Sequence, residues 1–351
     1  MSGAGRPVRV GLLGCGAVAQ LYYGPALERL AREGRIEVVA VHDPDARAAQ
    51  VFLGRHRSAS AATSLEDLVG HDPQLVIVAS PPQHHAQQVL FLLDRGIDVH
   101  CEKPLAADVV DGERMVRAAA SSGRRLSVGL VRRHFPATQA IAQLLAAGAI
   151  GRVTGISCFE GGPFSWPVRS PGYFSREKGS AGVLQDIGTH CLDLLVWWFG
   201  EPTGLRYADD ALGGVEVNCE IELRFGELPA TVRLSRDWSR PNEYVLTGTR
   251  GSIRWTVNEP AHFDLAIEGT AFVGHVALTE AVPDGGAEPP KRAVEFDDVF
   301  ADQLRMLTAP DRDSSVSGHD ALPSMRLVER CYANRRTMSM PWMKFEPVSP
   351  R

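Results

Sequence analysis

The chain has 351 residues, 44% of them hydrophobic and 23% charged, and a formal net charge of −5. This length accommodates about two domains with well-buried cores, and the absence of basic runs argues against a nucleic-acid partner or binding to a membrane surface. Six cysteines without a C-x-x-C pair favour reduced thiols in a cytoplasmic protein over disulfides or structural zinc, and no apolar stretch approaches the ~18–20 residues of a spanning helix.

The first informative stretch follows a polar leader, residues 1–7, which lacks the apolar core of a signal peptide. Residues 8–13 are small or branched and apolar, which predicts a buried parallel strand. The strand breaks into a G-x-G-x-x-A turn that opens a helix, Gly14-Cys15-Gly16-Ala17-Val18-Ala19. Gly14 permits the tight turn and Gly16 lets the backbone approach a pyrophosphate, which the free N–H groups at the helix N-terminus would bind.

A second predicted strand, residues 36–41, leads to Asp43. This acid lies roughly 20 to 25 residues beyond the turn, where a ribose-binding carboxylate belongs. The alternative is an Asp that caps the next helix before Pro44. Because Asp43 would repel a 2′-phosphate, we expect NAD as the cofactor. Arg47, one helical turn further on, would approach that phosphate if the loop rearranged, which leaves NADP open.

Strands and helices continue to alternate as far as residue 130. Helices are expected at 18–34 (interrupted at Gly24-Pro25), 46–53, 84–95 and 108–121, with a capped turn from Ser64, and strands at 75–79, 98–101 and 125–130. Apolar strands alternating with helices predict a parallel sheet covered on both faces. Because ligands bind at the carboxyl ends of such strands, the loops to inspect are 14–19, 43–47, 80–85, 101–104 and 131–134.

From about residue 151 the pattern changes to a period of two. Residues 215–225 alternate between apolar and polar side chains, which predicts a strand with one buried face. Further strands are expected at 152–159, 230–236, 243–248, 251–257 and 263–268, a loop at 280–290 and a terminal helix at 319–336. These strands predict an antiparallel sheet that forms a second domain.

Two groups of residues are candidates for chemistry. Lys103, directly after a predicted strand, could polarise a hydroxyl or carbonyl oxygen, although an E-K-P tripeptide is also a common surface turn. Asp186 and His190 are four apart and share a helix face. His190 suits acid–base chemistry near neutral pH, and Asp186 would orient it or bind a substrate hydroxyl. The alternatives are a capping Asp with a core His, or two metal ligands, for which no companion lies at a persuasive spacing; we expect no metal.

Taken together, these motifs resemble the Gfo/Idh/MocA family (glucose–fructose oxidoreductase, inositol dehydrogenase, rhizopine catabolism). The resemblance runs through residues 8–200 and more loosely into the C-terminal sheet. Besides the glycine turn it is carried by Ser80-Pro81-Pro82-Gln83-His84-His85-Ala86, Glu102-Lys103-Pro104 and Asp186-x-Gly188-x-His190-x-x-Asp193. It implies an α/β fold, with a Rossmann dinucleotide-binding domain at 1–131 and an α+β domain at 132–351 with a large, mostly antiparallel open sheet.

The resemblance also implies roles for individual residues. Lys103, Asp186 and His190 become the catalytic residues, and His190 stands where some relatives carry Tyr. The residues expected to bind the cofactor are Gly14, Gly16, Ala17, Val18, Asp43, Arg47, Ser80, Pro82, His85, Glu102 and Lys103. The implied reaction is NAD(P)-dependent interconversion of a hydroxyl and a ketone on a sugar, sugar derivative or cyclitol.

The substrate is expected to meet residues 160–180, a long loop rich in aromatic side chains and prolines. Trp166 would stack on a sugar ring, and Arg169 and Tyr173 would make polar contacts, together with Asp186 and His190. Arg133, just past the last Rossmann strand, would reach the same cleft. Several arginines near one pocket would suit a carboxylate or a nucleotide diphosphate on the substrate, but they are equally consistent with surface charges.

Two other functions remain open at this point. One is a non-catalytic dinucleotide-sensing regulator on the same fold, for which Lys103, Asp186 and His190 would have no use. The other is a related oxidoreductase that acts on a non-sugar substrate such as a dihydrodiol. In each case the second domain, with its exposed sheet surface, predicts a homodimer or homotetramer.

Overall fold

The computed structural model describes residues 6–167, 182–269, 273–277, 294–309 and 315–338. In this part of the chain the N-terminal half forms a parallel sheet of six strands in the order β3-β2-β1-β4-β5-β6. The strands are β1 (Val8–Leu13), β2 (Ile36–His42), β3 (Ser60–Ala61), β4 (Leu75–Val78), β5 (Asp98–Cys101) and β6 (Leu126–Val128). This strand order is that of a Rossmann fold, which confirms the predicted fold of this half.

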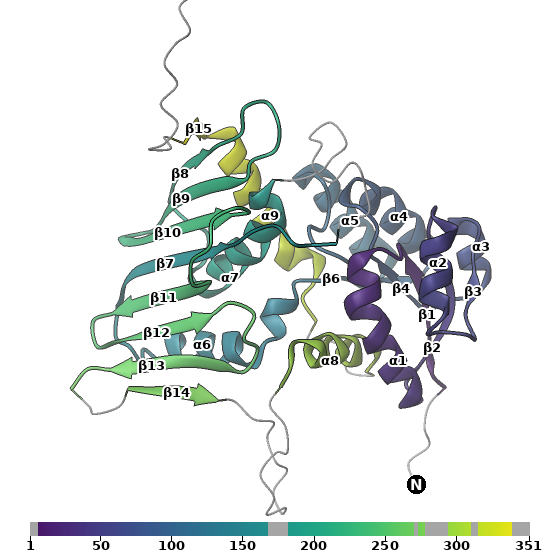
Figure 1. Cartoon of the computed structure of the whole chain (residues 1–351). Helices are drawn as coiled ribbons and strands as arrows, with labels where there is room; N and C mark the ends of the chain where they lie inside the picture. Colours follow the sequence, from purple (N-terminus) through teal and green to yellow (C-terminus); the bar gives the residue numbers. More distant parts are fainter. Residues whose placement is uncertain (1–5, 168–181, 270–272, 278–293, 310–314, 339–351) are drawn as a thin grey trace, which may run out of the picture.

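Helices connect these strands and cover the sheet (Figure 1). They are η1 (Ala19–Tyr23), α1 (Gly24–Arg32), α2 (Ala46–Leu53), α3 (Leu65–Gly70), α4 (Pro82–Asp94) and α5 (Val109–Ser122). The interruption expected at Gly24-Pro25 is a change of helix type instead of a break. Proline has no N–H to donate, and the turn before it widens to a π-helix in which the Gly24 N–H donates to the carbonyl of Ala19.

The C-terminal half forms a second sheet, whose described part has nine strands in the order β14-β13-β12-β11-β7-β10-β9-β8-β15. The strands are β7 (Val153–Gly161), β8 (Gly204–Asp209), β9 (Asn218–Phe225), β10 (Leu228–Ser235), β11 (Glu243–Gly248), β12 (Gly251–Thr256), β13 (His262–Ile267), β14 (Val273–Ala277) and β15 (Arg335–Thr337). The pairs β7–β10 and β8–β15 are parallel and the others antiparallel. The predicted mostly antiparallel sheet is therefore confirmed.

The alternation predicted over residues 215–225 is confirmed from Cys219 onward. It is wrong for the residues before Cys219, where Glu216 and Asn218 are buried and Val215 and Val217 are partly exposed, and β9 begins at Asn218. Cys219, Ile221 and Leu223 are buried, while Glu222 and Arg224 on the same strand are exposed. One face of the sheet therefore enters the core, and the other carries charged pairs such as Arg233–Glu220. The helices of this half are η2 (Val131–His134), α6 (Pro136–Ala146), η4 (Leu184–Gly188), α7 (Thr189–Phe199), α8 (Phe296–Thr308) and α9 (Gly318–Ala333).

The last two helices pack against the Rossmann half (Figure 1). Asp298 of α8 forms an ion pair with Arg29 of α1, with 2.7 Å between the nitrogen and the oxygen. On α9, Met325 lies against Gly112 of α5. A Cβ atom at Gly112 would lie 3.1 Å from the terminal methyl group of Met325. The division at residues 131 and 132 remains a prediction. The structure adds that the C-terminal end of the chain returns to cover the N-terminal domain.

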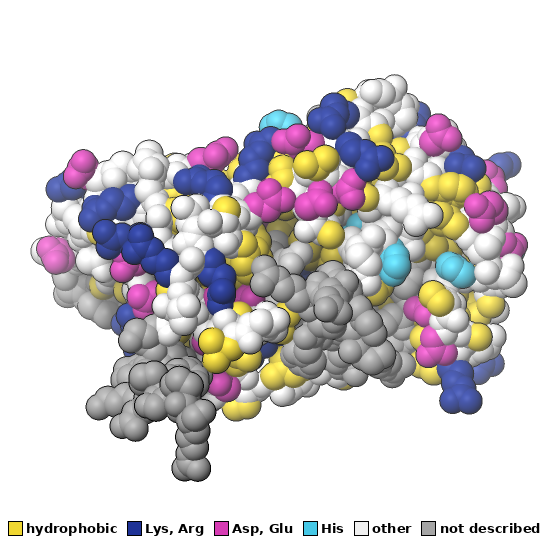
Figure 2. All heavy atoms as spheres, turned by 90° about the horizontal axis from the view of Figure 1, so that it is seen from above, with side chains coloured by type: hydrophobic (Ala, Val, Ile, Leu, Met, Phe, Trp, Pro, Cys, Tyr) yellow, Lys and Arg dark blue, Asp and Glu magenta, His cyan; other side chains and the backbone are white. Residues whose placement is uncertain are grey.

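The surface carries mixed charges. Figure 2 shows basic and acidic side chains of the described residues intermixed over one face. The six cysteines are all buried as free thiols. Among the described helices there is none with the length and apolarity needed to cross a bilayer.

Candidate active site

The glycine turn after β1 has the geometry of a dinucleotide site. Gly14 has φ +89°, and a Cβ there would approach the backbone of Ala79 and Ser80 to 2.6 Å, so this position requires glycine. At Gly16 a Cβ would meet nothing within 4 Å, which leaves bare backbone facing open space. Ala17 and Val18 follow as the partly exposed start of the helix. Exposed N–H groups beside an unobstructed glycine fit a pyrophosphate.

Asp43 lies against this turn. Its Oδ2 accepts a hydrogen bond from the Cys15 N–H at 2.7 Å, and its Oδ1 accepts one from Asp45 N–H at 2.8 Å. The cap of α2 is Asp45, whose side chain accepts from the N–H of Arg47. The capping role considered for Asp43 therefore belongs to Asp45, and Asp43 is fixed beside the glycine turn. The side chain of Arg47 is exposed on the first turn of α2.

His85 does not line the expected cofactor surface, because its side chain is fully buried. Its Nε2 lies 2.7 Å from the carbonyl oxygen of Ser80, and its Nδ1 lies 3.0 Å from that of Pro104. Burial lowers the pKa of this imidazole below its usual value. The imidazole lies between the loop at Ser80 and the loop at Pro104. The predicted direct contact with the cofactor is therefore corrected: His85 holds these two loops together. The Ser80 hydroxyl donates to Gln88.

Glu102 is also turned inward. Its carboxylate accepts hydrogen bonds from the Tyr23 hydroxyl at 2.7 Å and from the Lys103 N–H at 3.0 Å. The Tyr23 hydroxyl also lies 2.9 Å from Nε2 of His100, which is buried as well. Burial raises the pKa of Glu102. Glu102 thus fixes the backbone at Lys103, while Tyr23 and His100, which sequence reasoning missed, hold Glu102.

Lys103 and Asp186 meet as the resemblance implies. The Lys103 ammonium donates to Oδ1 of Asp186 at 3.0 Å and to the Asp186 backbone carbonyl at 3.1 Å. The second carboxylate oxygen, Oδ2, accepts from Arg236 at 2.9 Å. Asp186 lies on the π-helical turn η4, directly before α7. One cation from the Rossmann side, Lys103, and one from the second domain, Arg236, therefore meet at the Asp186 carboxylate.

His190 lies one turn beyond Asp186 and is partly buried. Its Nδ1 is buried without a hydrogen-bond partner among the described residues. Burial, and then the charges of Lys103 and Arg132, lower the pKa of the imidazole well below its usual value. His190 is therefore neutral at neutral pH. The Asp186 carboxylate accepts hydrogen bonds from Lys103 and Arg236, so Asp186 orients Lys103.

Arg133 does not reach this cleft. Its guanidinium binds the buried Asp193 of α7 through two hydrogen bonds of 2.7 and 2.8 Å and also donates to the Asp320 carbonyl. The expectation of a substrate contact is corrected, because a bidentate pair with a buried carboxylate occupies the guanidinium. Asp193 of the family motif thus has a structural role, joining α7 to η2.

The neighbouring Arg132 is buried beneath the site. It pairs with both carboxylate oxygens of Glu160 at 2.7 and 2.8 Å, and the Tyr244 hydroxyl donates to the same carboxylate. The side chains of Arg132 and Glu160 are 8% and 5% exposed. A pair this buried is sensitive to loss of either partner.

We expect Glu160→Gln to lower the free energy of unfolding by about 3–5 kcal/mol, because it leaves the buried charge of Arg132 without its counter-ion. Equilibrium denaturation with guanidinium chloride measures this. The matched control is Glu220→Gln, on the exposed face of the same sheet, whose pair with Arg233 is 33% and 48% exposed and is worth at most about 1 kcal/mol. Equal effects of the two variants would contradict the prediction.

One face of the ring of Trp166 is not free to stack on a sugar, because it packs on another aromatic side chain. Its ring stacks on Tyr22 of η1, with 6.1 Å between ring centroids and 22° between planes, and Tyr22 in turn stacks on Phe300 of α8. The aromatic loop therefore contacts the helix that follows the glycine turn. The predicted substrate contacts Arg169 and Tyr173 lie outside the described residues.

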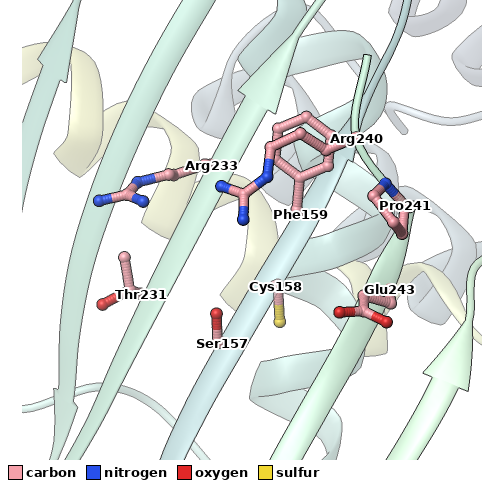
Figure 3. Close-up of a pocket in the computed structure, with 8 residues that line it drawn as sticks. All are labelled: Ser157, Cys158, Phe159, Thr231, Arg233, Arg240, Pro241 and Glu243. Carbon is pink, nitrogen blue, oxygen red and sulfur yellow. The ribbon is translucent and has the colours of Figure 1, made fainter. Parts of the chain in front are cut away.

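A hollow lies on the exposed face of the large sheet, and none of the candidate catalytic residues lines it (Figure 3). It is lined by Ser157, Cys158, Phe159, Thr231, Arg233, Arg240, Pro241 and Glu243. The Arg240 guanidinium lies 5.4 Å from the ring of Phe159. Among the described residues, no three His, Cys, Asp or Glu side chains gather in a group able to hold a metal ion.

A Rossmann sheet joined to a large open sheet, with a lysine, a carboxylate and a neutral histidine between them, defines a class of dinucleotide-dependent oxidoreductases. Comparison with known families gives the same result. Residues 8–130 match the model of the oxidoreductase family with an NAD-binding Rossmann fold, and residues 138–254 match the GFO/IDH/MocA C-terminal domain. The chain belongs to the Gfo/Idh/MocA family, and the family predicted from its motifs is confirmed.

Curated relatives include a trans-1,2-dihydrobenzene-1,2-diol dehydrogenase from Danio rerio, 30% identical over 64% of this chain and 67% of that protein. Inositol 2-dehydrogenase 3 from Saccharopolyspora erythraea is 36% identical over 54% of this chain and 53% of its own. The matches thus span about half to two thirds of these relatives. A solved levoglucosan dehydrogenase with NADH and levoglucosan shares the fold, with a TM-score of 0.81 at 18% identity, covering 93% of this chain and 97% of that one.

Proposed function

We propose that the protein is an NAD(P)-dependent oxidoreductase that interconverts a secondary hydroxyl and a ketone on a sugar, sugar derivative or cyclitol. The observation that carries this proposal is the convergence of Lys103, Asp186 and His190 just beyond the carboxyl end of β5. A nicotinamide, when bound there, accepts or supplies the hydride. The residues that would hold the dinucleotide are the glycine turn and Asp43, with Ser80, Pro82 and the Glu102-Lys103 backbone at the nicotinamide end.

Each catalytic side chain has a separate task. The Lys103 ammonium, held by Asp186, donates a hydrogen bond to the substrate oxygen and stabilises the negative charge that develops on it. The neutral His190 accepts the hydroxyl proton during oxidation and returns it during reduction. A binding-only regulator would have no use for this arrangement, which favours the enzyme over the dinucleotide sensor.

The relatives support two substrate classes. Inositol 2-dehydrogenases favour a cyclitol or sugar, while the dihydrodiol dehydrogenases favour an aromatic diol. Purified protein assayed with NAD⁺ and NADP⁺ against a polyol and cyclitol panel, and separately against aromatic dihydrodiols, distinguishes them through nicotinamide absorbance at 340 nm. Turnover confined to the dihydrodiols would replace the sugar proposal, and turnover with neither panel would contradict it.

The preference for NAD follows from Asp43. We expect NADH to bind at least tenfold more tightly than NADPH, because the fixed Asp43 carboxylate repels a 2′-phosphate. Titration read by energy transfer from the tryptophans measures both affinities. Asp43→Ser should reduce or reverse this preference, whereas tighter binding of NADPH by the unaltered protein would mean that a cation such as Arg47 overrides Asp43.

We also propose a homodimer or homotetramer through the exposed face of the large sheet. This face carries exposed Trp238 and the pairs Arg233–Glu220 and Arg254–Glu243. Light scattering on a sizing column gives the mass, and replacing Trp238 with Glu should favour the monomer. A monomer in the unaltered protein would exclude this proposal.

A further inference from the structure

The carboxylate at the centre of the site is shared between two cations. Asp186 Oδ1 lies 3.0 Å from the Lys103 ammonium nitrogen, and Asp186 Oδ2 lies 2.9 Å from a guanidinium nitrogen of Arg236. The Arg236 side chain is only 4% exposed, so this contact is built into the interior and not onto the surface. The motifs that resemble the family contain Lys103 and Asp186 but not Arg236.

We propose that Arg236 is a positioning residue that clamps Asp186 from the side opposite Lys103. This inference rests on the proposed function. It adds a residue whose task is to keep the site positively charged and the Lys103 ammonium directed at the substrate oxygen.

The backbone around Arg236 explains how it can act as a clamp. Arg236 directly follows β10, its N–H donates to the carbonyl of Val217 at 3.0 Å, and its carbonyl accepts from the N–H of Phe164 at 2.9 Å. The ring of Phe164 lies 5.2 Å from the guanidinium. The guanidinium is therefore supported by the sheet and by the start of the aromatic loop, and it gives Asp186 little freedom to rotate.

The charge balance shows what the clamp does. Arg236 adds a second positive charge to the Asp186 carboxylate. Because both cations draw on the same carboxylate, Asp186 neutralises Lys103 less completely, and more positive charge is left to stabilise a developing alkoxide on the substrate oxygen. Without Arg236, the Asp186 carboxylate would lose the hydrogen bond that Oδ2 accepts in the present arrangement.

The sequence makes the test unusually clean. It contains four lysines against 33 arginines, at positions 103, 178, 291 and 344. Within the described residues Lys103 is the only lysine. The rate at which an amine reagent modifies Lys103 can therefore be followed in a single peptide by mass spectrometry, without any substrate.

We expect Arg236→Ala to lower kcat by about 10- to 100-fold with little change in KM, as for a small misplacement of catalytic groups. Millimolar guanidinium should restore part of the loss, and Arg236→Lys, which keeps the charge, should retain most of the activity. The control Arg233→Ala, three residues earlier and on β10, should keep kcat and show no guanidinium effect. A kcat of Arg236→Ala within twofold of the unaltered protein would overturn the proposal.

The second measurement is the rate at which trinitrobenzenesulfonate labels Lys103. Arg236→Ala should slow labelling severalfold, because Asp186 then holds the ammonium alone, and Asp186→Asn should accelerate it. NADH binding confirms that each variant is folded; if Arg236→Ala is not, Arg236→Gln takes its place. Unchanged labelling in these variants would overturn the clamp. Changed labelling in a protein that turns over no substrate would support the clamp and contradict the proposed function, so the two failures are distinguishable.

Discussion

Lys103→Ala is expected to lower turnover by about 10²- to 10⁴-fold while leaving NADH affinity nearly unchanged. In the proposed function Lys103 donates to the substrate oxygen, and Asp186 holds its ammonium through two hydrogen bonds. Initial rates at 340 nm and the tryptophan energy-transfer titration measure the two effects separately.

The matched variant is Lys103→Arg, which keeps the charge but changes the geometry and cannot give up its proton. If the lysine acts as a positioned donor, this variant should also lose most of its turnover. Near-normal turnover in Lys103→Ala would remove Lys103 from the chemistry. A loss of NADH affinity equal to the loss of turnover would instead assign Lys103 to cofactor binding.

Gly16→Val is expected to abolish dinucleotide binding without unfolding the protein. A Cβ at Gly16 has no protein atom within 4 Å, so we expect the protein to accommodate the valine, whose side chain would occupy the place of the pyrophosphate. We expect at least a 100-fold loss of NADH affinity and a melting temperature within about 2 °C of the unaltered protein.

Gly14→Val is the matched comparison two residues earlier. Its side chain would collide with the backbone of Ala79 and Ser80 at a positive φ, so this variant should lose stability as well as binding. Thermal unfolding followed by circular dichroism separates the two variants. NADH binding that survives Gly16→Val would mean that the glycine turn does not contact the pyrophosphate.

The sequence predicted the parts of this protein that depend on neighbours close in the chain. The glycine turn, the buried strands and the cap at Ser64 are local patterns, and the structure confirms them. The family motifs predicted that Lys103 and Asp186 share a site although no local pattern joins them, since Lys103 follows β5 of the Rossmann sheet and Asp186 lies on η4 of the second half.

The tertiary structure alone decided which cations serve the site. Arg133 and Arg236 are both arginines just beyond a strand, yet Arg133 meets Asp193, 60 residues away, and Arg236 meets Asp186, 50 residues away. In the same way, His85 was predicted to contact the cofactor, but the fold buries it between two loops, where it lies against the Ser80 carbonyl. Such pairings depend on how distant elements pack and on which charges share a buried space, and a pattern read along the chain contains neither.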